Sequence, residues 1–243
     1  MLLTFKTGPS SLGVSEIARR VGLNTSIVHR LLRSLVDAEL LEQDEHTSRY
    51  RLGRGLASLA EVFFRQRRFD LVEPELRRLS TAAGGSAALA VRDGNEAVIL
   101  VYTPSLRPEQ VDARPRRVPL HLSALGRVLL AFGDPDDGGG LDALAPLSAA
   151  TRWSTTDLEV LRAELELIRH QGFAIVRRET SEDQLSIAVP VFDVDGRIYL
   201  ALGIRLQYHD DDDERRVDSV LAELRRSTPN VTEVLVGGAA TNQ

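Results

Sequence analysis

A stretch near the amino terminus carries hydroxyl and guanidinium groups at the spacing of one helix face. Its members are Thr25, Ser26, His29, Arg30, Arg33 and Ser34. Short hydroxyls and forked cations hydrogen-bond base edges and phosphates when a helix lies in the major groove of DNA. A solvated helix face is the alternative, and His29 suits a phosphate contact or a spacer as well as it suits base reading. We predict that this face binds double-stranded DNA.

Two predicted helices position this face. The first has apolar residues three and four apart and ends at Gly22. The second begins at a cap, Asn24 or Thr25, and its apolar residues define a buried stripe. The first stripe is Val14, Ile17, Ala18 and Val21, and the second is Ile27, Val28, Leu31, Leu32 and Leu35. Together they predict a helix-turn-helix.

A predicted hairpin follows the two helices. Leu40 to Glu42 leads into a polar tip, and Arg49 to Gly53 has the alternation of a returning strand. Arg49 and Arg51 share one face because side chains alternate along a strand. We therefore predict a wing whose two arginines contact phosphates beside the groove. A small helix pair with a polar outer face is common, so it is the order of helix, turn, helix and hairpin that favours DNA binding.

Four runs of this sequence resemble the IclR family of bacterial transcriptional regulators. Residues 14–35 and 49–53 resemble its winged DNA-binding domain, and residues 119–127 and 188–196 resemble its effector-binding domain. The resemblance implies an α+β protein in which an N-terminal winged helix-turn-helix is joined by a linker helix to a GAF-like α+β effector-binding domain with an antiparallel sheet. The expected ranges are 1–53 for the winged domain, 54–69 for the linker helix, 70–237 for the effector-binding domain and 238–243 for a tail. The family's first helix normally begins well before the position of residues 2–5, so we expect a start upstream of Met1 or a shortened first helix.

Local signals outline the rest of the chain. Residues 54–66 repeat apolar positions at helical spacing. This stripe packs either against the winged domain or against another subunit, and the resemblance favours the contact between subunits. A helix over 71–79 closed by Gly84 and a hairpin of 87–91 and 96–102 around Asp93-Gly94-Asn95 are predicted next. A solvated linker over 134–140 and a helix that begins at a capping box from Thr156 to Glu159 and ends at Gly172 follow. The last predicted helix has Asp211, Asp212 and Asp213 near its start.

Two later strands split into unlike faces. Residues 185–191 and 198–207 each alternate large aliphatic side chains with smaller or polar ones. The second face holds Ser186, Ala188, Pro190, Tyr199, Ala201, Gly203 and Arg205. Such a face is either a wet surface, the commoner outcome for an antiparallel sheet, or a wall with room for a ligand.

Ser123 is a plausible cap for a helix running to Phe132, and its free amides would favour an anion. The resemblance places the effector pocket among this helix start, the loop before the second hairpin and its strands. The pocket candidates carried over by position are Ala124, Leu125, Gly126, Val176, Ser186, Gly203 and Arg205. Relatives that bind small keto acids have acidic or hydroxyl side chains where this chain has Val176, Gly203 and Arg205. We therefore expect a small organic acid whose carboxylate meets Arg205, unless Arg205 pairs with an acid elsewhere in the fold or reaches water.

Composition restricts the alternatives. The 243 residues carry a net charge of −5, and the absence of Cys excludes disulfides, thiol chemistry and Cys-ligated zinc. Lys6 is the only lysine among 30 basic residues, a bias that codon usage in a GC-rich genome explains. No nucleophile, metal or nucleotide fingerprint occurs. We expect a cytoplasmic homodimer or dimer of dimers without cofactor, metal, membrane or enzymatic activity. An enzyme with an appended helical domain and a constitutive DNA-binding protein remain the alternatives.

Overall fold

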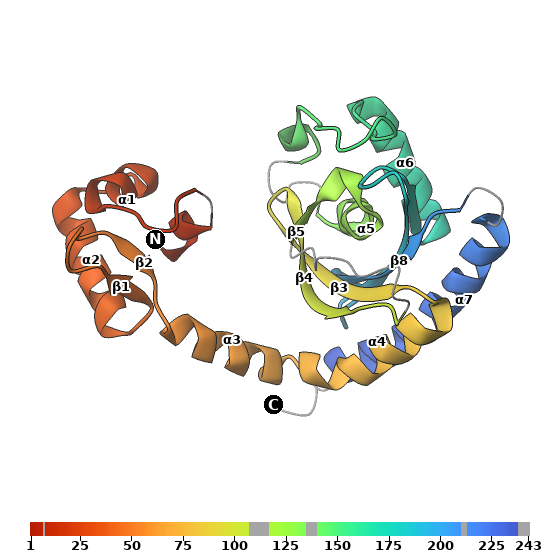
Figure 1. Ribbon diagram of the computed structural model, residues 1–243, viewed down its shortest axis with the longest axis horizontal. Helices are drawn as coiled ribbons and strands as arrows, with labels where there is room; N and C mark the ends of the chain where they lie inside the picture. Colours follow the sequence, from red (N-terminus) through yellow and green to blue (C-terminus); the bar gives the residue numbers. More distant parts are fainter. Residues whose placement is uncertain (7, 107–116, 135–139, 210–212, 238–243) are drawn as a thin grey trace. The chain divides into compact units, whose positions relative to one another are not determined.

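The computed structural model describes residues 1–6, 8–106, 117–134, 140–209 and 213–237, which form two compact units. The first unit is Met1–Arg67 and the second is Arg68–Gln243. Figure 1 shows the elements of each unit along the chain. The two units are described separately.

The first unit is a winged helix-turn-helix followed by a helix. Its elements are a 3-10 turn (Leu2–Phe5), α1 (Val14–Val21), α2 (Thr25–Asp37), β1 (Leu41–Gln43), β2 (Tyr50–Leu52) and α3 (Gly55–Gln66). Gly22 ends α1 in the left-handed conformation at φ 67°, and the Asn24 side chain caps α2 by accepting a hydrogen bond from the Ser26 amide at 2.8 Å. Both features confirm the predicted turn.

A small core holds this unit together. The buried residues are Leu12, Ile17, Ala18, Val28, Leu32, Leu41 and Tyr50. Tyr50 belongs to β2, so the wing packs directly against the helices. The predicted stripe of α2 was wrong at Ile27 and Leu31, which are 41% and 44% exposed. Positions 28 and 32 face the core, and positions 27 and 31 each lie about 100° away around the helix.

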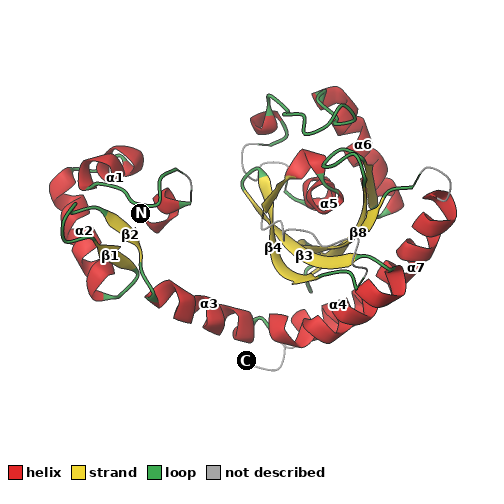
Figure 2. Ribbon diagram, in the orientation of Figure 1, coloured by secondary structure: helices red, strands yellow, loops and turns green. Residues whose placement is uncertain are grey.

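The second unit is a six-stranded antiparallel sheet with helices on both faces. Its elements are α4 (Phe69–Ala83), β3 (Ser86–Asp93), β4 (Glu96–Thr103), β5 (Arg117–Pro119), a 3-10 turn (Leu120–Leu122), α5 (Ala124–Phe132), a second 3-10 turn (Asp142–Leu144), α6 (Leu158–Gln171), β6 (Ala174–Arg177), β7 (Gln184–Phe192), β8 (Ile198–Gln207) and α7 (Asp213–Leu235). The strand order is β5-β4-β3-β8-β7-β6. Figure 2 shows these strands curving around α5, which confirms the expected α+β class.

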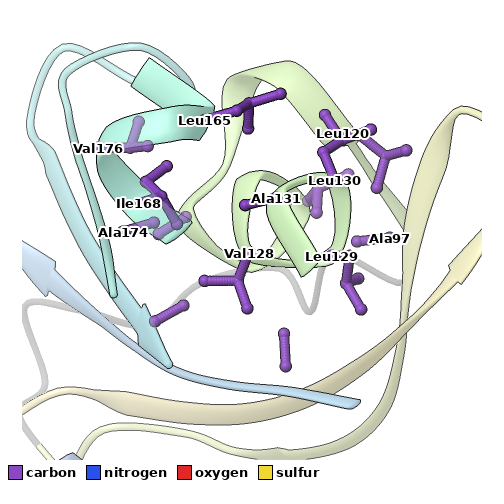
Figure 3. Packing of buried hydrophobic residues seen from close by; sticks show 14 of the residues in the cluster. Ala97, Leu120, Val128, Leu129, Leu130, Ala131, Leu165, Ile168, Ala174 and Val176 are labelled. Atoms are coloured by element: carbon purple, nitrogen blue, oxygen red, sulfur yellow. The ribbon is translucent and has the colours of Figure 1, made fainter. Parts of the chain in front are cut away.

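Each face of the sheet is buried by a different pair of helices. The helices α4 and α7 pack together over one face, whereas α5 packs on the other with α6 behind it. Figure 3 shows Val128 of α5 directed toward the strands beside Ile168 of α6. Ala188 and Ala201 lie fully buried in this same cluster. The small-residue face is therefore neither a wet surface nor an open wall for most of its length, because small side chains let α5 approach the strands closely.

Two helix boundaries refine the predictions from sequence. The cap of α6 is Asp157, whose carboxylate accepts hydrogen bonds from the amides of Glu159 and Val160, so the predicted capping box at Thr156 was wrong by one residue. Asp211 and Asp212 lie outside the described residues, as does most of the predicted linker 134–140. No helix in the described part of the chain is long and apolar enough to cross a membrane.

Candidate functional site

The outer face of α2 presents the predicted DNA-reading residues to solvent. Its six polar residues, named above, are all exposed. The side chains of His29, Arg30 and Arg33 have no hydrogen-bond or ion-pair partner among the described residues. Ile27 and Leu31 lie exposed next to them and can contact thymine methyl groups. The helix therefore offers unpaired cations, hydroxyls and apolar groups on one surface.

The two predicted wing arginines are already engaged within the domain. Arg51 pairs with Glu42 on the neighbouring strand at 2.9 Å, and both side chains are exposed. Arg49 donates to the carbonyl and the hydroxyl of Ser11 at 2.7 and 3.1 Å, and its guanidinium lies 3.4 Å from Glu16. A phosphate has to compete with these partners. Arg49 thus fixes the segment before α1 against β2.

The turn of the wing is held by one carboxylate. Asp44 accepts hydrogen bonds from the amide and hydroxyl of Thr47 at 2.7 and 2.8 Å and from the amide of His46 at 3.1 Å. The Thr47 hydrogen bonds lower the pKa of Asp44 below its ordinary value. The tip of the wing therefore stays negatively charged near neutral pH, so phosphates approach the strands of the wing more favourably than its turn.

A pocket of about 80 Å³ lies between the start of α5 and the sheet. It is lined by five of the seven candidate effector residues, namely Ala124, Leu125, Ser186, Gly203 and Arg205. Gly126 packs instead against the backbone of Leu120, where an added Cβ would lie 2.3 Å from the Leu120 carbonyl oxygen. Val176 is 2% exposed and belongs to the core under α6. The pocket thus occupies only the open end of the small-residue face.

Strand register places Arg205 between two serines. Ser86 of β3 and Ser186 of β7 both lie directly opposite Arg205 of β8, so the three side chains form one row on the pocket face. The Arg205 guanidinium donates to the Tyr102 hydroxyl at 2.9 Å. The Ser186 hydroxyl is buried and has no hydrogen-bond partner in the described part of the chain. The row can therefore offer several donors to one oxyanion.

An acid also lies near this row. The pKa of Asp183 is lowered chiefly by the hydrogen bond from Ser181, and the positive charge of Arg205 contributes to this shift.

The start of α5 supplies the opposite wall of the pocket. The Ser123 hydroxyl accepts a hydrogen bond from the Gly126 amide at 3.0 Å and so completes the cap of α5, as predicted.

Four polar lining residues were not predicted from the sequence: Ser86, Tyr102, Thr180 and Gln184. Ser86 and Tyr102 come from the first hairpin, which reaches the pocket because β3 pairs with β8. No local pattern signals that pairing. Taken together, the polar side chains that line the pocket are hydroxyls, one amide and one guanidinium. Such a set can bind a partly apolar ligand with one anionic end.

Comparison with known proteins identifies both units. Residues 1–45 match the IclR helix-turn-helix domain, and residues 65–232 match the family described as bacterial transcriptional regulator IclR C-terminal. The DNA-binding transcriptional repressor YiaJ of Escherichia coli is 31% identical over 209 residues, which cover 82% of this chain and 72% of YiaJ. The regulator BhcR of Paracoccus denitrificans is 30% identical, with 80% and 71% covered.

Solved structures agree with this assignment. A putative IclR transcriptional regulator from Silicibacter sp. TM1040 is 28% identical with a TM-score of 0.80, and the alignment covers 96% of this chain and 93% of that one. An IclR homolog from Microbacterium hydrocarbonoxydans, solved in complex with 4-hydroxybenzoate, is 27% identical with a TM-score of 0.66 and coverage of 96% and 95%. This chain therefore belongs to the IclR family of bacterial transcriptional regulators, and it is a DNA-binding regulator under the control of a small-molecule effector.

Proposed function

We propose that an oligomer of this chain reads a palindromic or repeated operator through α2 and that a small organic acid bound at α5 changes its operator affinity. The observation that supports the acid is the row of Ser86, Arg205 and Ser186. The guanidinium can take a carboxylate through two parallel hydrogen bonds, and the Ser186 hydroxyl gains its missing partner.

The rest of the pocket sets the size of the ligand. Leu125, Ile99 and Ile187 make most of the pocket wall apolar, and the pocket volume of about 80 Å³ suits a compact ligand. The structural relative that binds 4-hydroxybenzoate supports an acid with a small apolar part. The described lining holds no His, Asp, Glu or Lys that would act as a general base, so we infer binding in place of catalysis.

The regulator needs at least two copies, because repeated half-sites are read by paired helices. The helix α3 has no buried residue, although its sequence is apolar along one side. We infer that this side contacts a second copy and that the protein acts in the cytoplasm, where its operator lies.

The first prediction separates the two sites in one experiment. Operators are selected from genomic fragments with the full-length chain, and affinities are measured at fixed salt with a panel of carboxylic acids that includes 4-hydroxybenzoate. Arg33→Ala should cost about 1–3 kcal/mol of operator affinity, because it removes a base-reading guanidinium, and should leave acid binding intact. Arg205→Ala should abolish the response to acid and leave operator affinity nearly unchanged, since the two sites share only a coupling energy.

Matched controls make the result specific. Arg19→Ala removes an exposed arginine from α1, outside the reading face, and should change operator affinity little. Each acid is paired with its uncharged amide, such as 4-hydroxybenzamide. Equal responses to acid and amide, or an unchanged response in Arg205→Ala, would show that the anion site is wrong. Unchanged operator affinity in Arg33→Ala would show that this face does not read DNA.

A further inference from the structure

The segment 178–184 forms one wall of the pocket and connects β6 to β7. It contributes Thr180 and Gln184 to the lining. Its first residue, Arg178, has φ 64°, a left-handed conformation that a residue other than glycine keeps only where its surroundings hold it. The Arg178 amide donates to the Gln184 carbonyl at 2.7 Å, and the Thr180 hydroxyl donates to the Leu122 carbonyl at 2.7 Å. The segment is therefore a closed loop tied to the start of α5.

A buried ion pair holds this loop. Arg127 of α5 is 3% exposed, and its guanidinium donates to the Glu179 carboxylate at 2.7 Å. The same guanidinium donates to the His121 carbonyl at 2.8 Å and lies 3.0 Å from the carboxylate of Glu164 on α6. Arg127 thus connects the loop to two other elements from a position one turn after the pocket-lining residues of α5.

Glu179 carries the connection onward to the turn over residues 150–155. Its carboxylate accepts a hydrogen bond from the Thr155 amide at 2.7 Å, and its carbonyl accepts one from the Ser154 hydroxyl at 2.8 Å. The Thr151 hydroxyl donates to the Arg178 carbonyl at 2.6 Å. The carboxylate and the carbonyl of Glu179 and the carbonyl of Arg178 are therefore all held by α5 or by this turn.

A buried ion pair is poor support for stability alone, because desolvation opposes the attraction of the charges, but it can select one conformation of the groups that it joins. We propose that Arg127 is a positioning residue for the effector pocket, and that its pair with Glu179 holds the loop 178–184 closed over the bound ligand. This inference rests on the proposed function only in naming an acid as the ligand. The pair acts by keeping Thr180 and Gln184 in place, and it does not touch the ligand.

The chain contains its own reporter of the loop. Trp153 is the only tryptophan in the sequence, and its ring lies 4.5 Å from the guanidinium carbon of Arg178. The ring of Tyr208 lies 5.2 Å from the same carbon. Opening of the loop separates Arg178 from these rings. The fluorescence of Trp153 and its quenching by acrylamide therefore report on this loop, together with the turn over residues 150–155 in which Trp153 and its second cation partner, Arg152, lie.

The test compares two carboxylates that share one guanidinium. Glu179→Gln removes the loop carboxylate that pairs with Arg127. Glu164→Gln removes the α6 carboxylate that contacts Arg127 and leaves the pair of Arg127 with Glu179 intact. Hydrogen exchange of residues 178–184 and quenching of Trp153 are measured on the full-length protein without ligand. We expect exchange in this loop to rise about tenfold in Glu179→Gln and to stay at the wild-type rate in Glu164→Gln, with the helices unaffected. Arg127→Lys should restore most of the protection that Arg127→Met loses, because Lys keeps the charge.

The ligand arm uses 4-hydroxybenzoate and the acids of the operator experiment. For any acid that binds, we expect dissociation to be about tenfold faster from Glu179→Gln and unchanged from Glu164→Gln. If no acid binds the wild type, the proposed effector class is wrong, but the exchange result still decides the role of Arg127. Should Glu179→Gln not fold, Arg127→Met combined with Glu179→Leu removes both charges together.

Two outcomes of the exchange measurement would overturn the proposal. One is equal protection of the loop in Glu179→Gln and in the wild type. The other is an equal rise in exchange over the whole second unit, which would mark the pair as a general stabilising contact. Faster exchange without faster dissociation of a bound acid would also show that the loop does not retain the ligand.

Discussion

Arg127 faces two carboxylates, so three buried or half-buried charges carry a net charge of −1 between them. Glu164 is the more solvent-exposed of the two carboxylates, with a side chain that is 37% exposed. Burial raises the pKa of Glu164 above its ordinary value of 4.5, the charge of Arg127 opposes this rise, and the charge of Glu179 adds to it. The ionised form of this group is therefore disfavoured in the folded chain.

This shift predicts a pH-dependent effect of Glu164→Gln on stability. A raised pKa means that Glu164 binds its proton more tightly in the folded state than in the unfolded state. Protonated Glu164 therefore contributes its full share of the folding free energy below pH 4.5, the ordinary pKa, and this contribution is lost as the pH rises through the raised pKa of the folded state. Glutamine stays neutral throughout. The melting temperature of Glu164→Gln minus that of the wild type should therefore increase as the pH rises. We expect an increase of roughly 2 °C after allowance for solvent screening.

Melting curves between acidic and slightly alkaline pH measure this difference. Glu159→Gln, on the exposed side of the same helix, gives the baseline. A gap that shrinks with rising pH would mean that the attraction of Arg127 outweighs the burial of Glu164.

At the scale of elements, the close approach of α5 to the sheet determines the pocket. An added Cβ at Gly203 would lie 2.9 Å from the Leu125 side chain and 3.0 Å from the Ile187 carbonyl oxygen. At Gly126 it would lie 2.3 Å from a backbone oxygen, which cannot turn away. Gly203 therefore allows α5 to approach the sheet, whereas Gly126 allows α5 to approach the 3-10 turn at Leu120, which is the stiffer obstacle.

We predict that Gly126→Ala destabilises the chain more than Gly203→Ala does. Overpacking at Gly203 should cost about 1–3 kcal/mol in urea unfolding, because the end of Leu125 can shift, and it should also narrow the pocket and weaken acid binding. Gly126→Ala should cost more, since the backbone at Leu120 has to move. Equal losses of unfolding free energy would contradict the difference between flexible and rigid neighbours.

The sequence predicts well those elements that are determined by residues close together in the chain. The turn at Gly22 and Asn24, the cap at Ser123 and the hairpin at Gly94 all depend on neighbouring residues. The pairing of β3 with β8 joins strands more than 100 positions apart along the sequence, and no nearby residue specifies it. Ser86 and Tyr102 were missed for that reason, and the burial of Ala188 and Ala201 depends on a helix from another part of the chain.

At the scale of the whole molecule, we propose that association depends on α3. Leu59 and Phe63 lie four residues apart on this helix and are 55% and 42% exposed. We predict that Phe63→Glu shifts the protein from dimer to monomer and weakens operator binding, because a single copy reads only one half-site. Sedimentation equilibrium and operator titration measure the two effects.

Ser58→Glu adds the same charge to the same helix, about 100° around from Leu59, and should leave the dimer intact. A monomer in both variants would indicate general repulsion between copies, and a dimer in both would place the interface elsewhere.

The edges of the large sheet have a further consequence for such an assembly. In the described part of the chain the sheet ends at β5 and β6, which have three and four residues. Proline at position 119 lacks an amide hydrogen, and Arg117 is held by Asp93 and Glu96. Both edge strands are short, and β5 also carries a proline and a paired arginine, features that disfavour pairing with a strand from another molecule. If copies join through helices, as proposed for α3, each sheet stays complete. We then expect every chain in the assembly to keep its own pocket and saturation to require one effector molecule per chain.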